Sequence, residues 1–543
     1  MESTKKQMHY ARSFKEQFTI RGMIIGAIGA VIITTSSMYV ALRMGALPWP
    51  TIFVAIMSMT ILKALGNTNL NEINVTHTAM SAGSMVAGGL AFTVPGIWML
   101  NKSAQVSFVT LLVVTVAGTI LGVIFTALIR KYFIEGEKLP FPMGIAASET
   151  VLAGDEGGSK AKYLFFSLGI TAVFVALRDW FGKIPGAWMS STLMSKNIFF
   201  GVWIAPMAAA IGYIIGPLFT GVWFLGAVLS YFFIIPVGVG QGWFADVATA
   251  TAFKDSLGIG LMVGTGIGVL LKGIIPKAKE IYGPMVSGKA AKDANISLKW
   301  APILFAAVAF LLTVFTDMRL MPSIFTIIGV WLTTAMAASI TGQTGINPME
   351  IFGIIVLLGV KALFNTVGVE AFLVAGVVAV ACGLTGDVLN DFKSGYILKS
   401  DPKAQLIAEA IGGIIGAVVS VVVLFFMFKA YGAMGPGTEL PAPQAYAVST
   451  MVGGLPNPTA FIIGLIVGVV LYLLNIPGMT LGIGIYLPMA ISSAVFIGGA
   501  IGFLVNKIKP TSKDTGVIVA SGMLGGEGVT GVLIAIIKVL TMS

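Results

Sequence analysis

Residues 106–130 read VSFVTLLVVTVAGTILGVIFTALIR, a run that stays uncharged until Arg130 closes it. An α-helix rises 1.5 Å per residue, so about 20 apolar residues cross the roughly 30 Å hydrocarbon core of a bilayer. This stretch is therefore long enough to span a membrane. Runs of this kind follow one another from Arg21 to the end of the sequence. The pattern predicts an all-α polytopic membrane protein.

The composition of the 543 residues agrees with lipid as the main solvent. Hydrophobic residues make up 57% of the chain and charged residues 10%, whereas soluble proteins carry roughly 25% charged residues. The net charge of +10 comes from lysines and arginines at the ends of apolar runs. This is the positive-inside pattern of membrane proteins. It predicts the lipid bilayer as a partner and argues against nucleic-acid binding.

We count about sixteen candidate membrane segments, at 21–42, 48–65, 78–100, 106–130, 162–178, 200–219, 222–236, 258–275, 300–316, 323–341, 350–364, 370–390, 405–430, 457–474, 477–505 and 515–541. The connections richest in lysine and arginine are predicted to be cytoplasmic, together with the N-terminus. No small-residue cleavage site follows the first apolar run, so Gly22–Leu42 is expected to be a permanent helix. The predicted location is the plasma membrane.

The longest polar connection, 272–299, lies near the middle of the sequence and separates two halves that resemble diverged copies. LPFPMGIAAS at 139–148 has a counterpart in LPAPQAYAVS at 440–449, and PTIF at 50–53 has one in PSIF at 322–325. Internal repeats are common in secondary transporters. The predicted organisation is a cytoplasmic tail, a first transmembrane half, a cytoplasmic linker and a second transmembrane half, at 1–20, 21–275, 276–299 and 300–543.

Both Leu-Pro-x-Pro segments open apolar stretches of about fifteen residues, which are too short to cross. Proline removes a backbone donor at each entry, so we interpret both as re-entrant broken segments that point to a central site. The glycine-rich runs 478–484 and 522–531 allow the same interpretation. The alternative is that these glycines only allow helices to pack closely.

Charged residues inside apolar runs are the candidates for function, because a charge in a bilayer is costly unless it faces a partner or a cavity. Glu149 lies ten residues into the first broken segment, and Glu527 lies within GGEG at 525–528. We predict that they couple protons or bind substrate, although each could instead make a structural hydrogen bond to a neighbouring helix. The full set of candidates is Glu72, Glu149, Asp246, Glu350, Glu370, Asp387, Asp391, Glu409 and Glu527.

Glu72, His77, Asp391 and Tyr486 are also candidates for function. The polar stretch 67–78, which contains Glu72 and His77, could line an entrance, although a lone histidine is more often structural. Asp391 lies close to Lys393 at a helix end, which favours a role in fixing the loop and setting topology. Tyr486 in GIYLP at 484–488 is either an aromatic wall of the pathway or an interfacial anchor.

Several function classes are disfavoured. Two histidines and one cysteine, Cys382, are too few for an ordinary transition-metal site, so no metal and no cofactor other than a coupling proton are expected. The sequence has no P-loop, no Ser-x-x-Lys and no His-Glu-x-x-His pattern. It therefore predicts neither an ATP-driven pump nor an enzyme.

At these same segments the sequence resembles the oligopeptide transporter (OPT) family, in the compact form shared by prokaryotic members and the yellow stripe-like metal-chelate carriers. The resemblance runs from Glu72 to Gly531. It rests on EINVTHTAMSAGS at 72–84 with FTVP at 92–95, LPFP at 139–142 with AASE at 146–149, DFKSGY at 391–396 with Pro402 and Gln405, GIGIYLP at 482–488, and ASG at 520–522 with Gly526 and Glu527. The Asn-Pro-Gly and Lys-Ile-Pro-Pro-Arg signatures of the peptide-carrying eukaryotic branch are absent, and His77 stands where that branch would have glutamine.

The resemblance implies about sixteen helices in two pseudo-symmetric halves and uptake driven by the proton gradient. We therefore predict a symporter that imports small peptides or peptide-like metal chelates by alternating access. The predicted substrate and coupling residues are Glu149, Glu527, Glu72, His77, Tyr486, Ser148 and Asp391. The alternative is an uncoupled channel or a carrier for another small polar solute. The sequence leaves homo-oligomer formation open.

Overall fold

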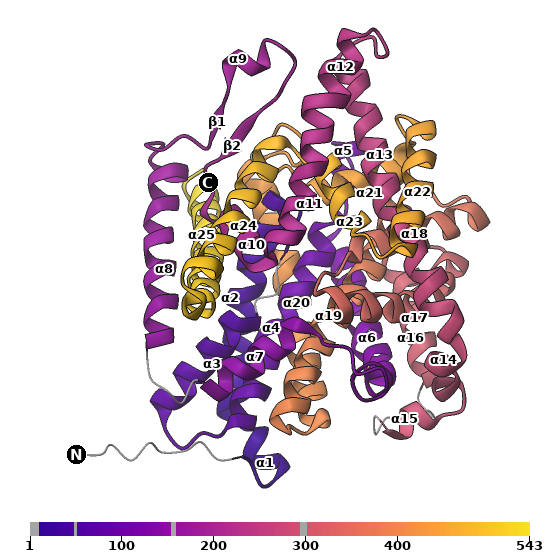
Figure 1. Cartoon of the computed structure of the whole chain (residues 1–543). Helices are drawn as coiled ribbons and strands as arrows, with labels where there is room; N and C mark the ends of the chain where they lie inside the picture. The colour runs from indigo at the N-terminus through magenta and orange to yellow at the C-terminus, as the bar shows by residue number, and fades with distance from the viewer. Residues whose placement is uncertain (1–9, 48–50, 154–158, 294–300, 543) are drawn as a thin grey trace. The chain divides into compact units, whose positions relative to one another are not determined.

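The chain forms two compact units in the computed structural model, which describes residues 10–47, 51–153, 159–293 and 301–542 (Figure 1). The first unit comprises 1–164, 274–448 and 539–543, and the second comprises 165–273 and 449–538. Each unit thus takes residues from both predicted halves. Residues 1–9 of the predicted tail, Pro50 of the predicted repeat and 294–299 of the predicted linker lie outside the described residues.

Eleven helices among the described residues are long and apolar enough to cross a bilayer. A twelfth span results if α21 (Pro443–Gly453) and α22 (Pro458–Leu473), which meet at a bend of 118°, form one broken span. The chain is therefore a polytopic α-helical membrane protein, as predicted. Shorter apolar helices such as α3 (Thr51–Leu65) also occur, and the count of sixteen stays a prediction.

The first unit contains most of the long helices. They are α1 (Phe14–Gln17), α2 (Ile20–Met44), α3, α4 (Leu70–Ala91), α5 (Gly96–Leu100), α6 (Phe108–Lys131), α7 (Pro142–Ala153), α14 (Ala278–Val286), α15 (Lys289–Asp293), α16 (Ala301–Phe315), α17 (Leu320–Thr344), α18 (Met349–Phe364), α19 (Gly368–Leu398), α20 (Pro402–Tyr431) and the start of α21.

The second unit holds the end of α21 and the remaining helices. They are α8 (Ser159–Val175, from residue 165), α9 (Ser191–Met194), α10 (Pro206–Ile215), α11 (Pro217–Val228), α12 (Ile235–Gly240), α13 (Val247–Gly268), α22, α23 (Gly478–Tyr486), α24 (Met489–Ile508) and α25 (Lys513–Met542, up to residue 538). A short antiparallel hairpin, which the sequence did not predict, pairs β1 (Ala187–Met189) with β2 (Gly201–Trp203) in the register Trp188 to Val202.

Side-chain caps define where several helices begin. Thr19, Asn69 and Ser107 each accept a hydrogen bond from the backbone N–H three residues later, at the starts of α2, α4 and α6. Such caps satisfy donors that the first helical turn leaves unpaired. The two 25-residue helices α2 and α17 end on glycines in the left-handed conformation, Gly45 at φ 62° and Gly345 at φ 73°. Glycine adopts this conformation without steric cost.

The two Leu-Pro-x-Pro segments break the chain where the sequence predicted. Phe141 and Ala442, each between two prolines, have φ of 43° and 39°, and the short helices α7 and α21 begin at the next residue. The Phe141 N–H donates to Gly342 O at 2.9 Å, and the Ala442 N–H donates to Leu42 O at 2.8 Å. The first segment thus docks on the C-terminal end of α17 and the second on that of α2.

Candidate functional site

Helices α4, α19 and α20 pack against one another within the first unit (Figure 1). Their contacts are close because small residues face each other. A Cβ added to Gly83 of α4 would come 3.1 Å from Gly416 Cα of α20, and one added to Gly89 would come 2.5 Å from Val380 N of α19. Backbones that approach this closely are typical of helix packing in membranes. Polar side chains on the three helices are therefore brought together.

Three carboxylates form a cluster at this contact. Asp387 and Asp391 lie one turn apart on the same face of α19, and Glu409 lies on α20. All three side chains are fully buried. Each offers a carboxylate oxygen within 4.8 Å of the other two. Oxygen atoms this close could share one cation, whether a proton or a metal ion.

His77 and Ser81 of α4 complete the surroundings of this carboxylate cluster. Ser81 Oγ donates to Asp391 Oδ2 at 2.7 Å. His77 Nε2 lies 3.3 Å from Asp391 Oδ1. His77 is fully buried, and neither of its ring nitrogens makes a hydrogen bond within the described part of the chain. Five polar side chains from three helices therefore meet at this cluster.

The cluster has fewer partners than buried charges need. When the carboxylates are ionised, neither oxygen of Asp387 and neither oxygen of Glu409 accepts a hydrogen bond from a donor among the described residues. No lysine or arginine of the described ranges forms an ion pair with any of the three carboxylates. Buried carboxylates are normally paired or hydrogen-bonded. The cluster is therefore a place where a cation is needed.

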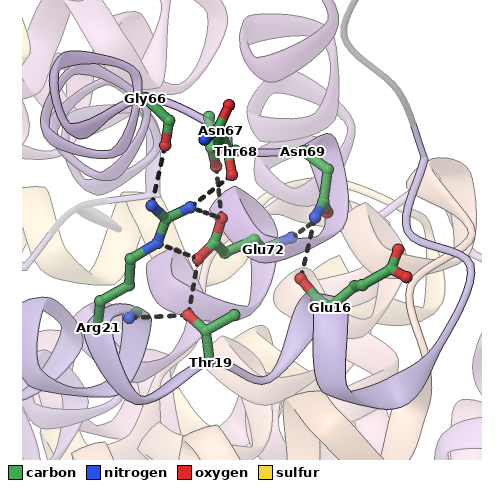
Figure 2. Close-up of polar contacts among 9 residues, drawn as sticks. Glu16, Thr19, Arg21, Gly66, Asn67, Thr68, Asn69 and Glu72 are labelled. Carbon is green, nitrogen blue, oxygen red and sulfur yellow. Dashed lines mark hydrogen bonds and ion pairs between the residues drawn. The ribbon is translucent and has the colours of Figure 1, made fainter.

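Glu72, a predicted entrance residue, lies apart from this cluster in the first turn of α4 (Figure 2). Arg21 of α2 donates from Nε to Glu72 Oε1 at 2.8 Å and from Nη2 to Oε2 at 2.7 Å. Thr19 and Thr68 also donate to the carboxylate, at 2.7 and 2.8 Å. Glu72 is 1% exposed and fully paired, which favours a structural role that ties α2 to α4. Its predicted role at an entrance stays a prediction.

Replacing Arg21 by alanine is expected to lower the free energy of unfolding by about 1–2 kcal/mol, because Glu72 then loses its charge-assisted hydrogen bonds. The Arg21 side chain is 36% exposed, so water replaces part of the loss. Thermal unfolding of the detergent-solubilised protein measures the change. Arg12→Ala, at an exposed position before α1, is the control, and equal stability of the two variants would contradict the prediction.

Ser148 and Glu149 lie on α7, which docks on α19 through Gly144. The Gly144 N–H donates to Asn390 Oδ1 at 3.0 Å, and a side chain at Gly144 would overlap Asn390 O. Ser148 is buried and donates to Ile145 O at 2.7 Å, whereas Glu149 is exposed. The structure thus places this pair beside the helix that carries Asp387 and Asp391. Their predicted role in coupling or binding stays a prediction.

Glu527 belongs to the second unit and is fully buried. Arg178 Nη2 donates to Glu527 Oε1 at 2.7 Å, and the Met207 N–H, at the start of α10, donates to Oε2 at 2.8 Å. Arg178 also makes two hydrogen bonds of 2.7 Å to Asp179. These contacts favour the structural alternative for Glu527. A coupling role stays a prediction.

Tyr486 ends α23 and is 4% exposed. Its carbonyl oxygen accepts a hydrogen bond of 3.0 Å from Lys254 Nζ, which also contacts Asp255 Oδ1 at 2.5 Å. A fully buried lysine of α13 thus caps the broken helix α23. The proposed pathway wall at Tyr486 stays a prediction.

Sequence reasoning identified Asp387 and Glu409 as membrane-embedded carboxylates but did not place them in the site. Asp387 and Asp391 are four positions apart in α19, a spacing that puts both on one face of the helix. This spacing is the sequence feature from which Asp387 could have been assigned to the same site as Asp391. Glu409 could not be added from sequence, because nothing local indicates which face of α20 meets α19.

Comparison with known proteins assigns the family. The family model described as OPT oligopeptide transporter protein matches residues 17–538. A Haemophilus influenzae protein named "Putative oligopeptide transporter" is 25% identical, over 92% of this chain and 92% of its own length. Two plant relatives carry the name "Probable metal-nicotianamine transporter". The YSL5 protein of Oryza sativa subsp. japonica is 25% identical over 78% of this chain and 74% of its own, and the YSL6 protein of Arabidopsis thaliana is 20% identical over 98% and 93%. The chain therefore belongs to the OPT family of membrane transporters.

Proposed function

We propose that the protein is a proton-coupled symporter that imports small peptides or peptide-like metal chelates by alternating access. The observation that carries the proposal is the buried cluster of Asp387, Asp391 and Glu409, which has no lysine or arginine partner among the described residues. We further propose that it works in the plasma membrane with a cytoplasmic N-terminus, as the distribution of basic residues predicts.

The charge balance of the cluster supports protons as the coupling ion. Two unit charges 4.8 Å apart repel each other by about 3.5 kcal/mol at an effective dielectric constant of about 20. Three ionised carboxylates would add three such pairs to the cost of leaving water. Protonation of the carboxylates removes both the repulsion between them and the cost of burying their charges. Each proton that dissociates restores part of both costs. The number of protons bound to the cluster therefore affects the free energy of the conformation in which the cluster is buried.

Corresponding contacts in the two halves support alternating access. Arg21 pairs with Glu72 at 2.7 Å, and Arg319 pairs with Glu370 at 2.9 Å, each pair joining the start of a 25-residue helix to the helix two positions later. The two Leu-Pro-x-Pro segments dock reciprocally, each on the long helix of the other half. We propose that these halves are diverged copies. Two equivalent arrangements of such copies would expose a central site to opposite sides in turn.

The names of the relatives support the proposed cargo class. Their names specify oligopeptides and metal–nicotianamine complexes, and both kinds of molecule carry amino and carboxylate groups. A protein that transports such a molecule needs some groups that bind its amino group and others that bind its carboxylate group. The buried carboxylates of the cluster suit a cationic group, and helix N-terminal ends suit an anionic one.

Uptake by proteoliposomes tests the function. We expect a labelled peptide panel, or nickel– and iron–nicotianamine chelates, to accumulate when the vesicle interior is made alkaline relative to the medium. Accumulation should vanish when a protonophore removes the gradient. Empty liposomes and an inverted gradient are the controls. Cargo entry at the same rate and to the same final level with and without the gradient would instead favour an uncoupled carrier or channel.

A further inference from the structure

A cavity of about 330 Å³ with several charged lining residues lies within the first unit. It is bounded by the C-terminal end of α6, the π-helical turn Tyr132–Gly136, and parts of α15, α19 and α20. This volume is at the lower end of the range for small-molecule sites. Its charged lining residues are Arg130, Lys131, Glu135, Asp401 and Lys403. Three cationic and two acidic side chains leave the cavity with one net positive charge.

The cavity adjoins the helical turns that carry the cluster. Phe392 lines it and directly follows Asp391, and Leu406 lines it one turn before Glu409. The Phe392 side chain is 1% exposed, so its ring is held in the packed wall between α19 and the cavity. A solute bound here would lie against the same turns of α19 and α20 that carry Asp391 and Glu409.

The guanidinium of Arg130, which lines this cavity, has more hydrogen-bond donors than its contacts use. A guanidinium carries five N–H donors. Arg130 Nη1 donates to Glu135 Oε1 at 2.8 Å, and the guanidinium lies 5.4 Å from the centre of the Phe392 ring. Its Nε is buried and has no hydrogen-bond partner among the described residues. The guanidinium thus has donors beyond the one that binds Glu135, and a carboxylate is the group whose geometry matches a guanidinium.

We propose that this cavity binds a carboxylate group of a small solute through Arg130, and that Arg130 thereby determines specificity for anionic cargo. The inference rests on the proposed function in one respect only, namely that the solute is the cargo. Glu135 competes with that carboxylate for the same guanidinium. The affinity of the site is therefore set by the balance between Arg130 and Glu135.

Cysteine labelling measures binding in this cavity without transport. The one native cysteine, Cys382, is fully buried, so the unmodified protein provides a low background. We place a thiol in the cavity by Leu406→Cys and label the full-length, detergent-solubilised protein with a membrane-impermeant methanethiosulfonate reagent. Nickel–nicotianamine and citrate, both rich in carboxylates, serve as probes. Each is expected to slow labelling in a saturable manner.

Two further substitutions in the Leu406→Cys protein give effects of opposite sign. Arg130→Gln removes the guanidinium and should raise the half-protecting concentration of the probes about 10- to 100-fold, as expected for a lost charge-assisted hydrogen bond. Glu135→Gln removes the competitor and should lower that concentration. If the Arg130–Glu135 pair were only structural, both substitutions would weaken protection alike. Lys102→Gln, an exposed charge outside the cavity, is the control and should change nothing.

The outcomes separate this proposal from the proposed function. Protection with opposite shifts in the two variants supports a carboxylate site, even if no cargo accumulates in proteoliposomes. The proposed function would stand and the carboxylate site would be overturned by gradient-driven uptake combined with either of two labelling results. These are equal shifts of the half-protecting concentration in the two variants, or no protection by either probe.

Discussion

Replacing Glu409 by glutamine is expected to reduce cargo accumulation in proteoliposomes from about tenfold to about onefold under a gradient of one pH unit. One pH unit is worth about 1.36 kcal/mol per proton, which supports a tenfold concentration ratio when one proton moves with each cargo molecule. Glutamine keeps the shape of glutamate but cannot take up and release the proton. The variant should therefore still exchange labelled for unlabelled cargo across the membrane, because exchange needs no net proton movement.

The control is Asp246→Asn. Asp246 caps α13 through a 2.7 Å contact with the Thr249 N–H and lies outside the membrane helices, and asparagine caps helices about as well. This variant should accumulate cargo like the unmodified protein. Asp387→Asn and Asp391→Asn are expected to resemble Glu409→Gln. Undiminished accumulation by all three cluster variants would remove the basis for proton coupling at this cluster. Glu149→Gln in the same assay tests the sequence-based prediction for that residue.

Replacing Arg178 by alanine is expected to destabilise the second unit by about 3–5 kcal/mol. Arg178 is 1% exposed, and its partners Glu527 and Asp179 are 0% and 18% exposed. Removing one partner of a buried ion pair leaves the other charge without compensation. The apparent melting temperature in detergent should fall accordingly, and the variant should show more aggregate than the unmodified protein in size-exclusion chromatography.

A double variant, Arg178→Met with Glu527→Gln, distinguishes a structural role of Glu527 from a coupling role. If Glu527 serves structure, the double variant should be more stable than Arg178→Ala, because the buried charge is gone and glutamine still accepts from the Met207 N–H. Glu527→Gln alone should then keep gradient-driven uptake. Loss of accumulation in a stable Glu527→Gln protein would return Glu527 to the coupling residues.

The carboxylate cluster illustrates which parts of the site could be found from sequence. Each of Asp387, Asp391 and Glu409 is conspicuous as a charge within an apolar run, since charge in a bilayer is costly. Their meeting point is not visible there, because Asp391 and Glu409 face each other only through the packing of α19 and α20. His77 is similar. The polar stretch around it predicts either an entrance or a structural histidine, and the structure places its Nε2 atom 3.3 Å from Asp391 Oδ1 at full burial.

The sequence by itself determined that the chain is a multi-span α-helical membrane protein of the OPT family, and where two proline-bounded segments break it. These properties depend on the length of each apolar run, on the backbone chemistry of proline, and on the order of the motifs along the chain. Each of them can be read from the sequence without knowing which segments pack together. The tertiary structure alone decided which carboxylates share a site, which are neutralised by arginine, and that the compact units draw on both halves. Those outcomes depend on which helix faces meet, and close approach at residues such as Gly83 and Gly416 is fixed by packing between segments far apart in the sequence.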